Sequence, residues 1–198
     1  MNNIWEQMAL RYETSERVND TKMIVQKIRS QLKETSLKTA LDYGCGTGLI
    51  GLGLIDLFAS MLFVDSSSKM LEQVNLKLKT NPRESARTLC VDLLDAIPPG
   101  LSIDYIIMAQ VLLHIPNTQL ILSQLFEVLK PDGHLIIVDF DKNEDIISDK
   151  VHNGFIQSEL KDLLQELGFQ WVESETFYHR AAMFMNKDAS MFILHCIK

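Results

Sequence analysis

Cysteine is scarce in this sequence of 198 residues, which contains only Cys45, Cys90 and Cys196. Their number is odd, their spacings are wide, and no Cys-x-x-Cys pair is present, which argues against a disulfide framework and against a cysteine-based metal centre. We therefore expect no metal cofactor and a reducing, cytoplasmic environment.

Long apolar runs and basic runs are also missing. No apolar stretch reaches the ~20 residues that span a bilayer. The first residues do not combine a basic start with an apolar run, as a secretory signal would. Nineteen Lys and Arg stand against 26 Asp and Glu, so the formal net charge is −7. Nucleic acids and anionic membranes usually attract basic patches, so we expect neither as a partner.

The sequence does contain enough apolar material for a sizeable core. It is 46% hydrophobic and 23% charged, close to the globular average, and its length fits one domain over residues 1–198. From about Leu37 onward, short apolar runs alternate with segments of helical period. That alternation is typical of α/β folds, in which helices cover both faces of a parallel sheet.

The pattern predicts seven strands. The first five are expected at 37–43, 60–65, 87–91, 103–109 and 134–140. The last two, at about 169–178 and 189–197, are joined by only about ten residues. Because a helical crossover needs more chain than that, these two strands must be antiparallel.

The helical period predicts five longer helices. They are expected at about 16–33, 46–58 and 118–129, and around Met70–Leu78 and Leu160–Leu167. The segment 46–58 is apolar nearly all round and contains Gly51 and Gly53. Each glycine costs ~1 kcal/mol in a helix interior, so we expect close packing against the sheet as compensation.

Three glycines, Gly44, Gly46 and Gly48, follow the first predicted strand, and Asp42 precedes them. In α/β folds a nucleotide-type ligand meets a helix N-terminus at this position. Glycines let the backbone turn sharply and approach the ligand without a Cβ in the way. A dinucleotide-binding loop would read GxGxxG, so the third glycine is early here, and no Lys-Ser/Thr pair of a phosphate-binding loop follows.

Two further acids end the next two predicted strands. Asp65 ends the second strand, where a carboxylate accepts hydrogen bonds from vicinal ribose hydroxyls. Asp92 ends the third strand. Since ligands of open parallel sheets lie outside the carboxyl ends of the strands, Asp42, Asp65 and Asp92 should all point into one crevice.

These motifs together resemble the class I S-adenosylmethionine-dependent methyltransferases of small-molecule type, over nearly the whole chain. The matching segments occur in the family's order and are ALDYGCGTG at 40–48, FVDSS at 63–67, CVDL at 90–93, IDYII at 103–107 and LKPDGHL at 129–135. The resemblance implies an α/β, three-layer Rossmann-like sandwich. Its mostly parallel seven-stranded sheet would have the order 3-2-1-4-5-7-6, with strand 7 antiparallel.

The resemblance also implies a role for each motif residue toward S-adenosylmethionine, the donor, and S-adenosylhomocysteine, the product. The glycine loop with Cys45 would surround the methionine end, and Asp42 would orient its ammonium group. Asp65, followed by Ser66, would hold the ribose. The remaining expected contacts lie at the adenine ring or the methionine group, and are Met70, Asp92, the Leu93 backbone and Gln110.

The first 35 residues are expected to form a helical lid. Trp5, Ala9 and Tyr12 resemble the N-terminal segment that many small-molecule members fold over the cofactor, and Tyr12 is the preferred contact. An aromatic residue that anchors a terminal helix to the core is the alternative for Trp5.

The acceptor side is less well defined. His114 is a candidate general base, although a structural residue before the next helix is the favoured interpretation. The apolar connection Tyr178–Met185, with Met183 and Phe184, is predicted to line an acceptor pocket or a dimer contact. The acidic segment 139–149 is expected to be a solvated loop.

A small organic acceptor is the expected substrate. The Asn/Asp-Pro-Pro-Tyr tetrapeptide of amino-methyltransferases is absent after the fourth strand, where the sequence reads AQVL. The predicted reaction is methyl transfer by in-line displacement, in a monomer or homodimer. Two alternatives remain: a catalytically silent S-adenosylmethionine-binding regulator, and an NAD-type oxidoreductase, against which the glycine spacing and Asp92 argue.

Overall fold

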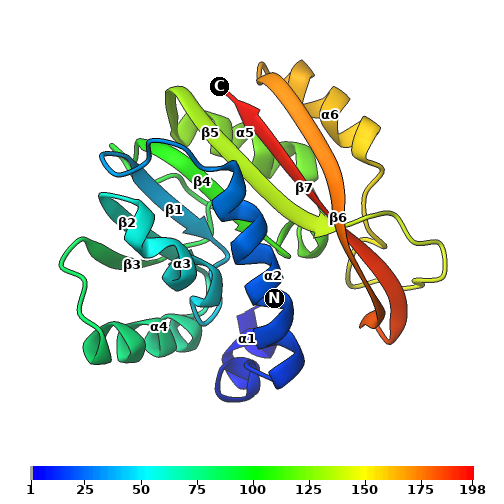
Figure 1. The fold of residues 1–198 in the computed structure, drawn as a ribbon, viewed down its shortest axis with the longest axis horizontal. Coiled ribbons are helices and arrows are strands. Elements are labelled where there is room, and N and C mark those ends of the chain that lie inside the picture. Colours follow the sequence, from blue (N-terminus) through cyan, green and yellow to red (C-terminus); the bar gives the residue numbers. More distant parts are fainter. Residues whose placement is uncertain (1) are drawn as a thin grey trace.

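The computed structural model describes residues 2–198, which build a seven-stranded sheet with helices on both faces (Figure 1). The strand order is β3-β2-β1-β4-β5-β7-β6, and β7 is antiparallel to both of its neighbours. The predicted fold class is therefore confirmed. The strands are β1 (Thr39–Tyr43), β2 (Ser60–Asp65), β3 (Ala86–Cys90), β4 (Ile103–Ala109), β5 (Leu129–Phe140), β6 (Gln170–Phe184) and β7 (Lys187–Ile197).

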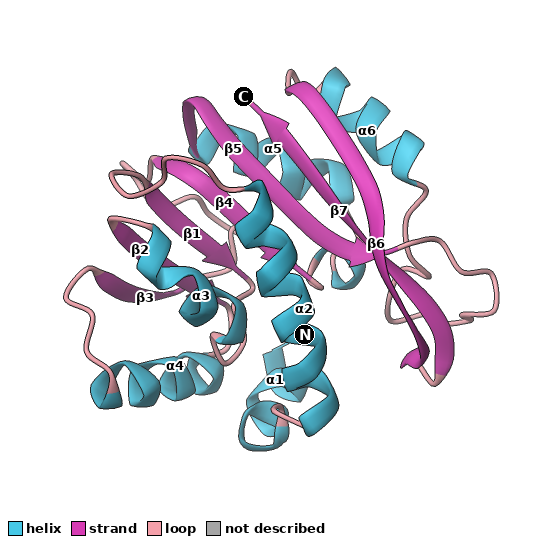
Figure 2. Cartoon of the chain, in the orientation of Figure 1, coloured by secondary structure: helices cyan, strands magenta, loops and turns pink. Residues whose placement is uncertain are grey.

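The helices divide between the two faces of the sheet (Figure 2). One core cluster joins the sheet to α2, α3 and α4, and the other joins it to α5 and α6. No helix within residues 2–198 is long and apolar enough to span a membrane. The helices are α1 (Asn2–Met8), α2 (Ser15–Gln31), α3 (Leu49–Leu54), α4 (Ser68–Thr80), α5 (Thr118–Val128) and α6 (Gln157–Glu166), with 3₁₀ turns η1 (Ala9–Arg11), η2 (Ile55–Leu57) and η3 (Leu112–His114).

Close packing explains the two glycines in the segment after β1. A Cβ on Gly51 would lie 2.5 Å from the Phe63 ring and 2.7 Å from the Asp42 carboxylate, so α3 rests directly on the sheet. A Cβ on Gly53 would lie 2.8 Å from Val25 in α2, so this second glycine allows α3 to pack closely against α2 and not against the sheet. The predicted helix at 46–58 is shorter than expected, because it ends at Leu54 and continues as η2.

The last two strands correct one prediction. The segment 178–185 is not a connecting loop, because β6 runs to Phe184 and β7 begins at Lys187. Met185 and Asn186 have φ of 50° and 61°, which is the two-residue turn that suits the twist of a hairpin. Phe184 is buried and stacks on Phe140 at 4.4 Å, and Met183 packs against the same cluster. Met183 and Phe184 therefore pack in the core and do not line the cleft described below.

Candidate cofactor cleft

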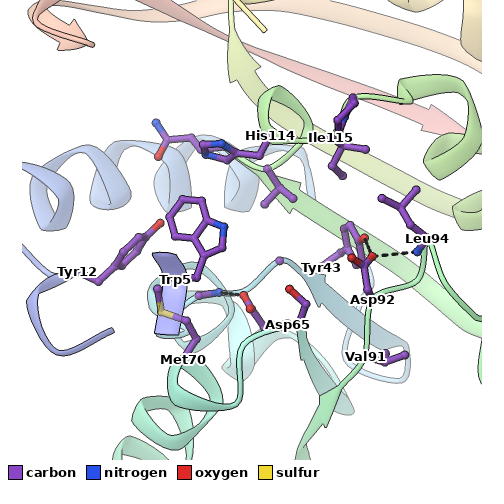
Figure 3. A pocket seen from close by; sticks show the side chains of 16 residues that line it. Trp5, Tyr12, Tyr43, Asp65, Met70, Val91, Asp92, Leu94, His114 and Ile115 are labelled. Atoms are coloured by element: carbon purple, nitrogen blue, oxygen red, sulfur yellow. Dashed lines mark hydrogen bonds between the residues drawn. The ribbon is translucent and has the colours of Figure 1, made fainter. Parts of the chain in front are cut away.

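A cleft of about 860 Å³, counted out to its open mouth, lies at the carboxyl ends of β1, β2 and β4. Figure 3 shows its walls, to which the N-terminal segment, the sheet and the segment after β4 all contribute. The predicted residues that line it are Tyr12, Gly44, Gly46, Asp65, Ser66, Met70, Asp92 and Gln110.

The glycine loop forms the floor of the cleft with its backbone. Gly44 and Gly46 have φ of +66° and +53°, the left-handed region in which side chains are strained. A Cβ on Gly44 would also lie 2.6 Å from Val111. Gly48 has a positive φ too, but it caps α3 and lines neither this cleft nor its neighbour. The third glycine therefore shapes the turn without facing the cleft.

Asp65 links the glycine loop to the start of α4. One carboxylate oxygen accepts from the Gly46 backbone N–H at 2.8 Å, and the other accepts from the Ser67 backbone N–H at 2.8 Å. Each oxygen can accept a second hydrogen bond, so two positions remain for ligand hydroxyls. Burial raises the pKa of Asp65, while these two backbone donors oppose the increase.

Asp92 lies at the far end of the cleft, after β3. Its carboxylate accepts from the Leu94 backbone N–H at 3.0 Å and from the Tyr43 hydroxyl at 3.5 Å (Figure 3). Leu93 has its side chain fully buried in the core, and Val91 and Leu94 line the cleft on either side of Asp92. A backbone contact from Leu93 to the cofactor stays a prediction.

A second, smaller cavity of about 440 Å³ adjoins the cleft and shares Tyr12, Gly44 and Gln110 with it. Asp42 and Cys45 line this cavity. Asp42 is only 2% exposed and accepts from the Gly51 backbone N–H at 2.9 Å. Burial raises its pKa to about 7, and the charge of Asp65 adds to the increase. Asp42 therefore anchors α3 as well as facing the cavity.

The N-terminal segment covers the cleft. Tyr12 lies over Gly46, and the Arg17 guanidinium lies 4.3 Å from the centre of its ring. Trp5 projects between Tyr12 and His114 (Figure 3). Glu6 accepts a hydrogen bond at 3.0 Å from the hydroxyl of Ser67 at the start of α4. These contacts attach the segment to the residues that follow β2.

His114 belongs to the aromatic cover of the cleft. Its ring packs edge-on to Trp5 at 4.9 Å. Burial, reinforced by the positive charge of Arg17, lowers the pKa of His114 to about 4. A neutral imidazole with so low a pKa holds a proton poorly at neutral pH, which makes it a weak general base. Its packing favours the structural interpretation of this residue.

Asp139 is a residue whose role the sequence pattern missed. It is fully buried near the end of β5, not part of a solvated loop. Its carboxylate accepts from the backbone N–H groups of Leu113 and Phe140, at 3.1 and 2.8 Å. Burial raises its pKa to about 7. It thus holds η3, and with it His114, against the carboxyl end of the sheet.

Several apolar cleft residues were also missed, namely Val91, Leu94, Val111, Ile115 and Pro116. They follow the strand ends, and strand-end position is the only signal that would have pointed to them. No three His, Cys, Asp or Glu side chains within residues 2–198 are grouped so that they could hold a metal ion.

An α/β sheet with a glycine loop, strand-end acids and an aromatic cover defines a nucleoside-binding class of protein. Residues 41–135 match the family model described as a methyltransferase domain. The chain is 26% identical over 107 residues to a ubiquinone biosynthesis O-methyltransferase of Cupriavidus pinatubonensis, covering 54% of this chain and 43% of that protein. It spans less than half of the curated relatives it matches first.

Two solved structures share the fold. A SAM-dependent methyltransferase from Aquifex aeolicus superposes with a TM-score of 0.72 at 18% identity, covering 97% of both chains. Phosphoethanolamine N-methyltransferase 2 of Haemonchus contortus, solved with phosphomonomethylethanolamine and S-adenosylhomocysteine, has a TM-score of 0.73 at 15% identity. It covers 91% of this chain and 52% of that chain. The family-model match and these two folds agree with the methyltransferase resemblance that the sequence motifs implied.

The cleft fits the cofactor of this family. Gly44 and Gly46 line the cleft with a backbone that carries no side chain, which allows close approach of a ligand. Asp65 keeps one free acceptor position on each oxygen for a ribose diol. Asp92 and the apolar side chains around it suit a flat ring with an amino group.

Proposed function

We propose that this protein transfers a methyl group from S-adenosylmethionine to a small organic acceptor by in-line displacement. The observation that carries the proposal is the continuous wall of glycine loop, Asp65 and Asp92 at the carboxyl edge of the sheet. The bound cofactor would supply an already activated methyl group on its sulfonium.

Orientation is the first contribution of the chain. Asp65 would hold the ribose, Asp92 the adenine amino group, and the backbone of the glycine loop the methionine end. Good orientation alone is worth ~7–11 kcal/mol of a displacement barrier. Asp65 is well suited, because backbone N–H groups fix both of its oxygens before a ligand arrives.

Exclusion of water is the second contribution. We propose that residues 1–35 act as a lid, in which Trp5 and Tyr12 cover the cleft from one side and His114 from the other. A dry site strengthens the electrostatic interactions inside it. The Glu6–Ser67 hydrogen bond would hold this lid closed.

The acceptor is proposed to be a small molecule, with oxygen or nitrogen as the methylated atom. Similarity to O-methyltransferases and N-methyltransferases supports this class. Gln110 supports a site for it next to the methionine end, because it lines both cavities and has a strained φ of 56°. Its amide donates only to the Met191 sulfur, at 3.5 Å, so it remains available to a ligand.

Ligand-induced thermal stabilisation and methyl release test the proposal. S-adenosylhomocysteine should raise the melting temperature and NAD should not. Radiolabelled S-adenosylmethionine should then release methyl groups to some member of a panel of amines, phenols, thiols and carboxylates. No thermal shift at millimolar S-adenosylhomocysteine would exclude the donor. A shift without transfer to any acceptor would favour the silent, cofactor-binding regulator.

The lid can be tested separately with Trp5→Ala and Glu6→Ala. Both should weaken S-adenosylhomocysteine binding several-fold and increase exchange of the Tyr12 backbone amide. Leu10→Ala is the matched control, because Leu10 lies in the same segment and is 85% exposed. Equal effects from all three substitutions would contradict a specific lid role.

A further inference from the structure

A groove of about 1020 Å³, counted out to its open mouth, lies at the amino end of the parallel strands, away from the cofactor cleft. In Figure 1 the C-terminus and the start of β6 lie at the upper edge of the sheet, whereas α1 lies at the lower edge. Tyr105 lies near the start of β4 and Gln110 directly follows its end, so the two sites are roughly 16 Å apart at the usual rise per residue. We call this feature the amino-end groove; its lining includes Tyr105, His134, Trp171 and His195.

Aromatic rings from four strands form a continuous row along this groove. Tyr105 stacks on His134 at 4.3 Å with an interplanar angle of 7°. His134 lies 5.0 Å from His195, and His195 lies edge-on to Trp171 at 5.1 Å. Trp171 ends the row and is 50% exposed, at a φ of 47° that bulky residues rarely adopt. An indole face is thus held open to the groove.

One buried polar atom in the same row lacks a partner. His134 Nδ1 and His195 Nε2 share a hydrogen bond at 2.9 Å. His195 is 7% exposed and its Nδ1 has no partner among residues 2–198. Buried polar groups in native proteins are normally satisfied, so His195 Nδ1 points to a missing partner. The Tyr105 hydroxyl takes part in no hydrogen bond within the described chain either, and it is open to a partner that enters from the groove.

The chemistry of the histidine pair specifies what that partner needs. Two neutral imidazoles that share one hydrogen bond leave one N–H and one lone pair on their outer nitrogens. The Tyr105 hydroxyl adds a group that both donates and accepts. A partner that satisfies this edge therefore carries a donor and an acceptor, and the indole of Trp171 favours a flat ring.

We propose that the amino-end groove binds a small planar heteroaromatic molecule that carries a hydrogen-bond donor and an acceptor on its edge. The ring lies against Trp171, and its edge meets His134 and Tyr105. The site is separate from the cofactor cleft and does not depend on methyl transfer. Lys33 and Glu173 also line the groove, so both signs of charge are present for substituents of the ring.

Fluorescence of Trp171 provides a direct test. The chain has two tryptophans, so Trp5→Phe leaves Trp171 as the only one. Benzimidazole, which carries one N–H and one ring lone pair, is titrated in the presence of saturating S-adenosylhomocysteine, which occupies the cofactor cleft. The expected result is a saturable change in emission with half-saturation at or below about 1 mM, the affinity range of a fragment-sized ligand.

Matched probes and variants separate this site from unspecific stacking. Indole, which lacks the ring lone pair, should bind at least about five-fold more weakly, the effect of one lost hydrogen bond. His134→Phe and Tyr105→Phe should each weaken benzimidazole about five-fold, whereas only one of them should weaken indole, which has only its N–H to lose. His179→Phe is the control, because His179 lies on β6 outside the groove and bonds to Ser190.

Four results would overturn the proposal. They are no saturable change up to about 10 mM benzimidazole, equal weakening in His179→Phe, competition between benzimidazole and S-adenosylhomocysteine, and a response to Zn²⁺ alone with none to benzimidazole. Tyr105→Phe keeps the test valid if His134→Phe fails to fold.

Discussion

Carboxylates at the two ends of the same sheet have opposite electrostatic environments. At the carboxyl end, burial raises the pKa of Asp42 and of Asp139 to about 7, and the residues that hydrogen-bond to them contribute only backbone N–H groups. At the amino end, partial burial of Asp104 is outweighed by hydrogen bonds from Lys130 and Thr39, which lower its pKa to about 2.

The difference shows what each end is built to do. Asp104 ties β4 to β1 and β5 with an ion pair and stabilises the sheet. Asp42 and Asp139 instead hold α3 and η3 in place beside the cleft, and this placement costs stability whenever they are ionised. A binding site is thus maintained at one end by the stability that the rest of the fold supplies.

The largest effect is expected from Asp65→Ala, which removes the carboxylate that we propose holds the ribose. Loss of two charge-assisted hydrogen bonds should weaken S-adenosylhomocysteine binding by about 100-fold or more, measured by calorimetry. Asp95→Ala is the control, since Asp95 is exposed and does not line the cleft. Binding within about three-fold of wild type in Asp65→Ala would show that the cleft recognises something other than a ribose.

Gly44→Ala should destabilise the glycine loop by about 3 kcal/mol, because a left-handed φ and a clash with Val111 act together. For a chain of this length that is roughly 6–12 °C in melting temperature. Gly100→Ala has a similar φ of +78° with no atom within 4 Å, so it should cost only about 1–2 kcal/mol. Similar melting temperatures for the two variants would mean that Val111 moves aside freely.

The pH dependence of stability sharpens the contrast between the two ends. A carboxyl whose folded pKa lies above its unfolded value near 4 contributes stability below that value, and the contribution is lost as pH rises through about 7. As pH rises from 5 to 8, Asp139 should therefore lower the unfolding free energy, whereas the lowered pKa of His114 and of His195, about 4 in each case, should raise it up to about pH 6.5. Asp139→Asn isolates the first effect. Its change in unfolding free energy from pH 5 to pH 8 should be more favourable than that of wild type by about 2 kcal/mol, measured by urea denaturation.

Asp104→Asn is the matched comparison for that measurement. Its folded pKa of about 2 and its unfolded value both lie below pH 5, so the substitution should leave the change between pH 5 and pH 8 unaltered. Its own contribution is lost only as pH falls from about 4 through 2. A larger loss of unfolding free energy from pH 5 to pH 8 in Asp139→Asn than in wild type would contradict the assignment of a buried, largely protonated carboxyl.

The smallest effect is expected at His114. Because its pKa of about 4 leaves it neutral throughout the neutral range, His114→Asn should lower kcat/KM by less than about ten-fold through loss of packing on Trp5. The pH profile between 6 and 8 should keep its shape. If the wild-type profile shows an ionisation near pH 6–7 that is absent from His114→Asn, His114 acts as a general base.

Local patterns made most of the fold predictable. The strand bounds 60–65 and 103–109 match β2 and β4, because a buried parallel strand is a continuous apolar run that ends at a polar residue. The hairpin of β6 and β7 was too short in the prediction, because the segment 178–185 was interpreted from its composition alone and its register shifts leave no regular two-residue alternation that would mark a strand. Asp139 was predicted to lie in a solvated loop for a related reason. It begins a segment rich in acidic residues, and that composition does not show which one of them is buried.

By itself the sequence determined the order of the functional motifs along the chain, the glycine loop, and the acids at the strand ends. Each of these depends on residues that are adjacent in the chain. Only the tertiary structure decided that Trp5 and His114 meet over the cleft. It alone decided that Tyr105, His134, Trp171 and His195 form one row at the opposite end. Those residues are far apart in the chain and come together through strand register, which follows from pairing across the whole sheet.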